Sequence, residues 1–221
     1  MLAIFKREFK SYFQNVIGWL FVAALLAVYG LYFYVYNLKN GYPYISYDLN
    51  GIGFIMMIAV PILTMRSLSD EKKTKTDQLM LTSPVSVGKI VAGKYFAMAA
   101  VYTIDIALFA LSPLVLSIYG KVALSEAYVA LFGYWLYGLS CIAVGLFISS
   151  ISESVIISAI LTFAALFLSY MMQSITGLIS SSGNLLTKVL NCFDLYTPFE
   201  NFVSGCFSVC LLYTSPSPRD A

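Results

Sequence analysis

The chain has 221 residues, of which 60% are hydrophobic and 11% are charged, and its formal net charge is +2 at pH 7. Its mean hydropathy is +0.82, whereas soluble domains are only about 45–50% apolar. The composition therefore excludes an ordinary soluble domain and places the chain in a bilayer.

The first predicted element is a short amphipathic helix that precedes the first apolar run. Its apolar face is Leu2, Phe5, Phe9, Tyr12 and Phe13, and its polar face is Lys6, Arg7, Lys10 and Gln14. This helical spacing predicts a helix that lies at the membrane interface. Two roles stay open, a positive-inside anchor or a lever that transmits motion from a partner into the first span.

Five apolar runs follow, each with at most one charged residue and each near the roughly 20 residues that cross about 30 Å of hydrocarbon. They are Val16–Tyr36, Leu49–Met65, Tyr95–Tyr119, Ala127–Ile151 and Val155–Gln173. The first run is too long for the apolar region of a cleaved signal peptide. The predicted fold class is therefore all-α, a polytopic helical membrane protein. Pro61 and Pro113 are expected to kink their helices.

The distribution of Lys and Arg predicts the orientation. Nine basic residues lie before the first span or between the second and third, and three lie in the other loops before the tail. The nine are Lys6, Arg7, Lys10, Arg66, Lys72, Lys73, Lys75, Lys89 and Lys94, and the three are Lys39, Lys121 and Lys188. The N-terminus, the loop after the second span and the turn at Glu153 are thus predicted to be cytoplasmic. Topology explains these charges, so they indicate no nucleic-acid partner.

The charged loop carries signals of a short helix. Ser67 and Asp70 fit a capping box, and Glu71 with Lys75 forms a favourable i,i+4 pair. The helix is predicted to run from Asp70 to about Leu81, because Pro84 disfavours helical geometry in the residue before it. A plain solvated loop stays open as the alternative, since capping boxes are common.

Several segments match one family pattern. In the run LTMRSLSDEKKTKTDQLMLTSPVSVGKIVAGKY, the matching positions are Asp70-Glu71-Lys72, Thr76, Leu79–Ser86 and Ile90–Lys94. Ile148–Thr162 and Tyr196–Phe202 agree as well. On these residues the chain resembles the type-2 ABC exporter permease family, over nearly all of residues 1–209. One departure is Ser154-Val155, where the family often has Asn-Gln.

The resemblance implies a permease subunit with six helices in the cell membrane, paired with a second permease, identical or related, and with cytosolic ABC ATPase subunits. Its coupling helix would be carried by Asp70, Glu71, Lys72, Lys73, Lys75, Thr76, Leu79 and Leu81. Its external element would include Pro198, Phe199 and Glu200. The chain has no G-x-x-x-x-G-K-[ST] motif, so ATP hydrolysis is expected in a partner and no enzyme activity or cofactor is expected here.

Asp105 is the informative polar residue within the spans. A carboxylate facing lipid costs roughly 2.5–3.5 kcal/mol on insertion scales, so Asp105 should face the bundle or a wet path. A role in the path or the dimer seam and an internally satisfied structural carboxylate both stay open.

Two stripes of small residues predict close helix packing. One is Gly138, Cys141, Gly145 and Ser149, and the other is Ser154, Ser158, Thr162, Ala165 and Ser169. The chain has no His and only four scattered Cys, which argues against a metal site. Pairing of Cys192 with Cys206 in an oxidising compartment stays open.

The C-terminal tail stands apart. Cys210 to Asp220 reads CLLYTSPSPRD, which matches the translation of a sequencing-library transposon adapter at every codon. Residues 210–221 are therefore expected to be non-native, and 1–209 an incomplete permease domain with five of six spans. An ordinary Ser/Pro-rich tail is the alternative.

Three function classes follow. The first is the permease of an ATP-driven exporter. The second is an ATPase-coupled membrane scaffold or mechanotransmitter that moves no solute. The third is a channel or intramembrane enzyme, which would need a polar stripe on several spans where Asp105 stands nearly alone.

Overall fold

The structure is a computed structural model that describes residues 2–41, 45–69, 72, 87–119, 124–179 and 199. Every multi-residue element within these residues is helical, as predicted. In chain order the elements are α1 (Leu2–Gln14), α2 (Val16–Phe33), η1 (Tyr34–Lys39), α3 (Ser46–Thr64), α6 (Val87–Phe109), α7 (Ser112–Tyr119), α8 (Leu124–Ile151) and α9 (Val155–Ile179).

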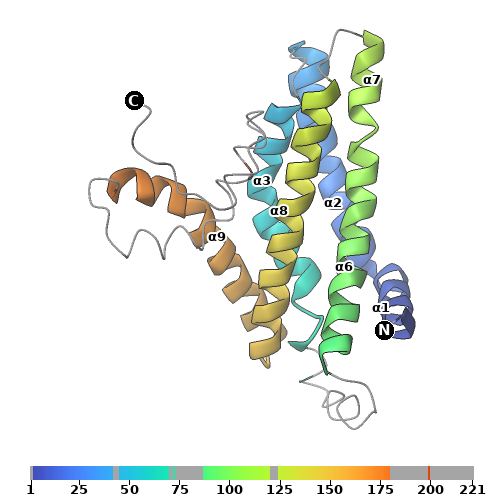
Figure 1. Cartoon of the computed structure of the whole chain (residues 1–221), viewed down its shortest axis with the longest axis vertical. Helices are drawn as coiled ribbons and strands as arrows, with labels where there is room; N and C mark the ends of the chain where they lie inside the picture. Colours follow the sequence, from blue (N-terminus) through green and yellow to red (C-terminus); the bar gives the residue numbers. More distant parts are fainter. Residues whose placement is uncertain are drawn as a thin grey trace.

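Four helical columns form an upright bundle, α2 with its π-helical extension η1, α3, α8, and α6 continued by α7 (Figure 1). The contacts close a ring, since α2 packs on α3 and α6, and α8 packs on the same two helices. Each of the five predicted spans falls on a helix of the bundle or on α9. Gly18–Lys39, Val87–Ile118 and Leu124–Ile151 are long and apolar enough to cross a membrane, and Asp48–Thr64 and Val155–Met171 are shorter apolar stretches.

The bundle is apolar inside and outside. Leu25, Met57 and Val101 are fully buried between the helices. Large apolar side chains also face outward, with Ile118 80% and Phe147 65% exposed. Water would penalise an exposed apolar surface of this kind, whereas lipid tails solvate it.

The first small-residue stripe is confirmed as a packing surface of α8, because all four of its members are buried. A Cβ at Gly138 would overlap the ring of Tyr102 on α6, and one at Gly145 would lie 2.5 Å from Oγ1 of Thr64 on α3. Real Cβ atoms essentially never approach so closely. Glycine at these two positions is what lets α8 touch both neighbours.

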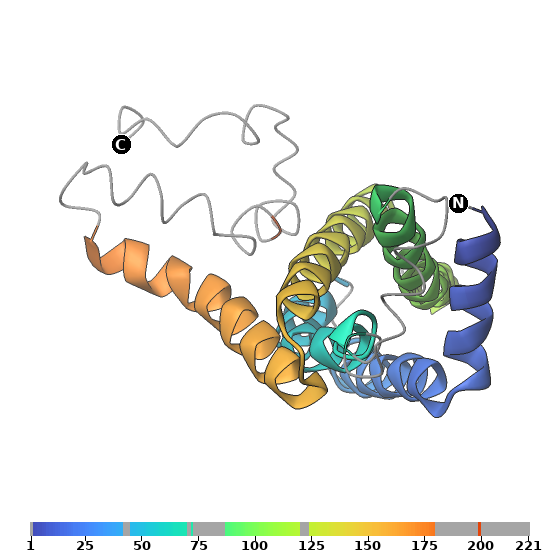
Figure 2. The same cartoon turned by 90° about the horizontal axis from the view of Figure 1, so that it is seen from below.

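Helix α9 leaves the bundle at the turn after α8 and leans away from it (Figures 1 and 2). It packs on α3 and α8 through the second predicted stripe, in which Ser158, Thr162 and Ser169 are buried. Its other faces carry exposed apolar residues, such as Ile156 at 71% and Ile160 at 62%.

The two prolines behave differently. Pro113 follows a break, because α6 ends at Phe109, a turn occupies 110–111, and α7 begins at Ser112. The predicted interruption of this span is confirmed. Pro61 lies inside α3, which continues to Thr64, so there the missing N–H removes one backbone hydrogen bond without ending the helix.

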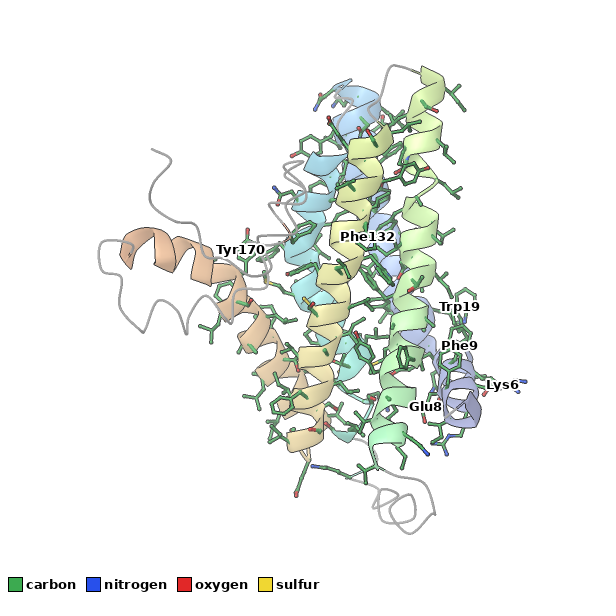
Figure 3. All side chains as sticks on the ribbon, in the orientation of Figure 1. Lys6, Glu8, Phe9, Trp19, Phe132 and Tyr170 are labelled. Atoms are coloured by element: carbon green, nitrogen blue, oxygen red, sulfur yellow. The ribbon has the colours of Figure 1, made fainter. Side chains whose placement is uncertain are left out.

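Helix α1 lies along the outer edge of the bundle at its lower end, beside α6 and crosswise to the upright helices (Figures 1 and 2). The two predicted faces are confirmed where they are described, with Phe5, Phe9, Tyr12 and Phe13 half-buried and Lys6, Arg7, Lys10 and Gln14 exposed. The side chain of Leu2 lies outside the described part of the chain. The rings of Phe5, Phe9, Phe13 and Trp19 form a ladder with successive centroid distances of 5.9, 5.0 and 5.4 Å (Figure 3). The helix also packs on protein, because Ile4 lies against Gly93.

Several predictions fall outside the residues that the structure describes. They concern most of the predicted loop helix, the pairing of Cys192 with Cys206, and the adapter-like segment 210–221.

Candidate functional site

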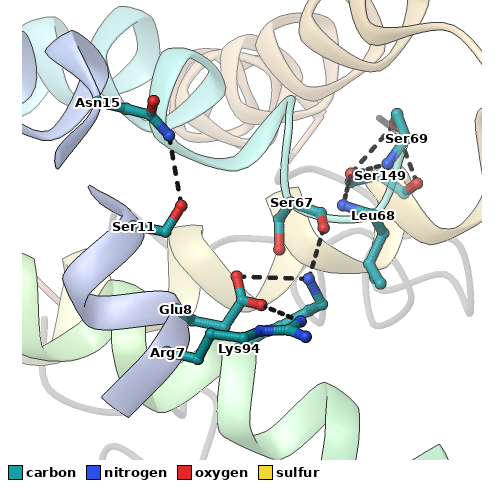
Figure 4. Close-up of polar contacts among 9 residues, drawn as sticks. All are labelled: Arg7, Glu8, Ser11, Asn15, Ser67, Leu68, Ser69, Lys94 and Ser149. Carbon is teal, nitrogen blue, oxygen red and sulfur yellow. Dashed lines mark hydrogen bonds and ion pairs between the residues drawn. The ribbon is translucent and has the colours of Figure 1, made fainter. Parts of the chain in front are cut away.

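The described residues on both sides of the charged loop make two groups of polar contacts, which are joined by the chain that leaves α3 and which together we call the polar junction. Its members are Glu8, Ser67, Leu68, Ser69, Lys72, Lys94, Ser149 and Ser150. Figure 4 shows most of these residues, drawn from four separate parts of the chain. They lie where α3 ends and α6 begins, which we call the loop end of the bundle.

Lys94 on α6 is the centre of the polar junction. Its side chain is only 2% exposed although it carries a charge. Its Nζ donates a hydrogen bond to the Ser67 carbonyl oxygen at 2.9 Å and lies 3.5 Å from Oε2 of Glu8. An ammonium taken out of water needs such partners, because desolvation costs several kcal/mol. Lys94 thus connects α6, the chain leaving α3, and α1.

Glu8 extends the polar junction to the N-terminal helix. Its side chain is 15% exposed, and its Oε1 also accepts a hydrogen bond from Nη2 of Arg7 at 2.9 Å. Arg7 is 60% exposed, so that surface pair adds little. Sequence reasoning missed Glu8. The available signal was its spacing, three residues after Phe5 and four before Tyr12, which puts a lone carboxylate on the apolar face of a basic helix.

Ser149 joins the loop end to α8. Its Oγ accepts hydrogen bonds from the backbone N–H groups of Leu68 and Ser69 at 3.2 and 3.3 Å. The Ser69 hydroxyl in turn donates to the Ser149 carbonyl oxygen at 3.1 Å. Both serines are fully buried. The sequence indicated Ser149 only as a small packing residue, whereas its hydroxyl holds the chain that leaves α3.

Lys72 makes a second attachment to α8. Its Nζ donates to the Ser150 carbonyl oxygen, one residue before α8 ends at Ile151. The last carbonyls of a helix are unpaired and carry the negative end of its dipole, so they favour a cation. The other predicted coupling residues, Asp70, Glu71, Lys73, Lys75, Thr76, Leu79 and Leu81, lie outside the described residues, and their role stays a prediction.

The predicted capping role of the Ser67 hydroxyl is wrong. This hydroxyl is buried and has no hydrogen-bond partner. The Ser67 N–H donates to the Thr64 carbonyl at 3.1 Å, so Ser67 completes the last turn of α3 and does not open a new helix. Its carbonyl is then free to accept the hydrogen bond from Lys94.

Two further predicted sites are described in part. Glu153 is exposed in the turn between α8 and α9, and its cytosolic placement stays a prediction. Phe199 is 2% exposed and stacks on Tyr137 of α8 with ring centroids 5.2 Å apart. Pro198 and Glu200 lie outside the described residues.

Asp105 faces the bundle interior, as predicted, and is fully buried. Neither carboxylate oxygen has a hydrogen-bond partner, so the internally satisfied alternative is wrong. Its role in the path or at the dimer seam stays a prediction. At the opposite end of the bundle, sequence reasoning missed a buried pair in which the Asn37 amide of η1 donates to the Asp48 carboxylate of α3.

A family model described as "ABC-2 family transporter protein" matches residues 32–213. The chain belongs to this family. As an ABC-2 family member it is a multi-pass membrane protein, the permease subunit of a transporter. The matched range includes every member of the polar junction except Glu8. Comparison with curated proteins and with solved structures found no match.

Proposed function

We propose that this chain is the permease subunit of an ATP-driven ABC exporter in the plasma membrane, with its N-terminus in the cytoplasm. It forms the translocation path with a second permease subunit, identical or related. Separate cytosolic ATPase subunits bind its charged loop and supply the energy. The family match and the nine-to-three distribution of basic residues support this assignment.

The polar junction is the observation that carries the coupling role. Ser69 and Lys72, before the loop, are attached to α8. Lys94, after the loop, is attached to Glu8 on α1 and to the Ser67 carbonyl. Because these contacts tie both ends of the loop to the helices, a displacement of the loop would move α1, α6 and α8 together. A solvated connector would have no use for a buried ammonium at its base.

The coupling role predicts that Glu71→Lys and Leu79→Asp each abolish association with the ATPase subunit. Reversing the charge disrupts polar docking, and a carboxylate replacing Leu79 disrupts apolar docking. The ATPase is first identified by co-purification with the wild-type chain from native membranes. Both variants should still insert in the membrane, and the matched control Lys89→Ala, at an exposed position of α6, should co-purify normally. Unchanged co-purification of both loop variants would show that the loop is only a connector.

Solute movement separates the exporter from a scaffold that moves no solute. In inside-out vesicles that hold the whole complex, an exporter should accumulate a solute that also stimulates ATP hydrolysis. The scaffold would be favoured if the complex hydrolyses ATP but accumulates none of the tested solutes, and if its locus encodes further envelope proteins.

The orientation predicts a labelling pattern. In a background with all four Cys replaced by Ser, a thiol at Thr74 or Glu153 should be protected from an impermeant reagent in intact cells. A thiol at Ser181 or Lys39 should be labelled, since Lys39 lies at the opposite end of the bundle from Glu153. Permeabilised cells provide the control, in which all four positions should react. Labelling at Thr74 in intact cells would reverse the orientation.

A further inference from the structure

The bundle holds a buried carboxyl group that the polar junction does not use. Asp105 lies near the middle of the long apolar stretch Val87–Ile118. It is 11 residues beyond Lys94 on the same helix, about 16 Å along the axis at 1.5 Å per residue. Among the described residues, Lys94 is the buried basic side chain. Asp105 is therefore too far from it for an ion pair.

The surroundings of Asp105 are aromatic and offer it no hydrogen bond. Tyr102 lies three residues before Asp105 on α6, and its ring centroid is 6.2 Å from that of Tyr134 on α8. The Tyr102 hydroxyl donates to the Tyr134 carbonyl oxygen at 2.7 Å, so its hydrogen is already used. The Tyr134 hydroxyl is buried without a partner, as are both carboxylate oxygens of Asp105. Water has no access, because all three side chains are fully buried.

Among the residues that the structure describes, no helix around α6 supplies a positive charge at this level. The titratable core groups on the elements around α6 are Tyr29 on α2, Asp48 on α3, and Tyr134, Tyr137 and Cys141 on α8. The charged side chains of α1 lie at the loop end, where Glu8 meets Lys94. Every one of these core groups is neutral or negative, so none of them can balance a carboxylate.

An unpaired, unsolvated charge in an apolar interior carries a large free-energy penalty, and such groups neutralise instead. A metal cation would need several oxygen ligands and enough space to hold them. The packed rings around Asp105 provide neither the ligands nor the space. A proton needs no room. We propose that Asp105 is a proton-binding site of the permease, which holds a proton while the bundle is packed and releases it when water reaches the core between α6 and α8.

This site has a measurable consequence for stability. The packed state binds one proton more than the opened state, so the packed state is favoured at low pH and loses stability as the pH rises. The ratio of packed to opened chain should fall by up to about tenfold for each pH unit over the range in which the proton leaves. The inference depends on the packing of the bundle and not on the direction of transport.

Infrared spectroscopy of the full chain in lipid nanodiscs tests the proposal. At neutral pH the wild-type chain should show the C=O stretching band of a neutral carboxylic acid, and Asp105→Asn should lack it. Asp48→Asn is the control for the other fully buried carboxyl group, whose Oδ2 accepts a hydrogen bond from Asn37 while its Oδ1 has no partner. The band assigned to Asp105 should persist in that variant.

A second variant keeps the test decisive if Asp105→Asn folds poorly. Asp105→Glu should keep a neutral band at a shifted frequency. Thermal melting of the wild-type chain should fall with rising pH, and the fall should be smaller in Asp105→Asn. An unchanged spectrum in both Asp105 variants would overturn the proposal. So would a melting temperature that follows added NaCl at fixed pH and not the pH, because a bound cation would then occupy the site.

Discussion

Replacement of Lys94 by Ala should lower the stability of the packed chain by about 3–5 kcal/mol, the range for breaking a buried ion pair on one side. The loss is large because Glu8, only 15% exposed, is then left with the exposed Arg7, and the Ser67 carbonyl loses its donor. Thermal melting of the purified chain in detergent measures the effect. Lys89→Ala is the matched control, because Lys89 lies on the same helix and is exposed. A melting temperature equal to that of this control would contradict the polar junction.

A double-mutant cycle tests the contact itself. Lys94→Met combined with Glu8→Gln should cost less than the sum of the two single changes, because the attraction between these two side chains is lost only once in the double variant. The difference should exceed about 0.5 kcal/mol, the usual threshold for residues in contact. Strict additivity would mean that α1 and α6 are packed together without an electrostatic contact, and that α1 serves as an anchor only.

Replacement of Gly138 by Ala should also destabilise the bundle strongly, by about 1–3 kcal/mol as in other overpacked cores. The added Cβ overlaps the ring of Tyr102, which is fully buried and cannot move into open space. The matched control is Gly30→Ala on α2, where a Cβ meets nothing within 4 Å. That change should be neutral or stabilising by up to about 1 kcal/mol, because alanine is the better helix former.

A compensating change at Tyr102 strengthens this test. If the overlap causes the loss, Tyr102→Leu combined with Gly138→Ala should cost less than the two changes added together, because the smaller side chain leaves room for the Cβ. An additive result, or equal melting temperatures for the Gly138 and Gly30 variants, would show that α6 and α8 are not in close contact at this level.

Hydropathy and residue spacing determined the helices of this protein. The five apolar runs fall on α2 with η1, α3, α6 with α7, α8 and α9, because the length of a span is set by bilayer thickness and can be counted along the chain. Two bounds differ clearly from the prediction, since α6 begins at Val87 and not at Tyr95, and α9 ends at Ile179 and not at Gln173. The two faces of α1 and the small-residue stripe of α8 could be read in the same way. Each depends on residues three or four apart on one helix, so local geometry is sufficient.

Only the tertiary structure decided which side chains meet. Glu8 and Lys94 are 86 positions apart and Ser69 and Ser149 are 80 apart, so their contacts depend on how each helix is rotated and how deeply it sits. A lysine near the end of a span ordinarily extends its ammonium to water, and nothing in its own sequence neighbourhood shows that Lys94 is covered by α1. The same holds for Asp105, because its lack of a partner is a property of the four packed helices and not of α6. Burial and pairing arise from the sum of many distant contacts, which no local pattern contains.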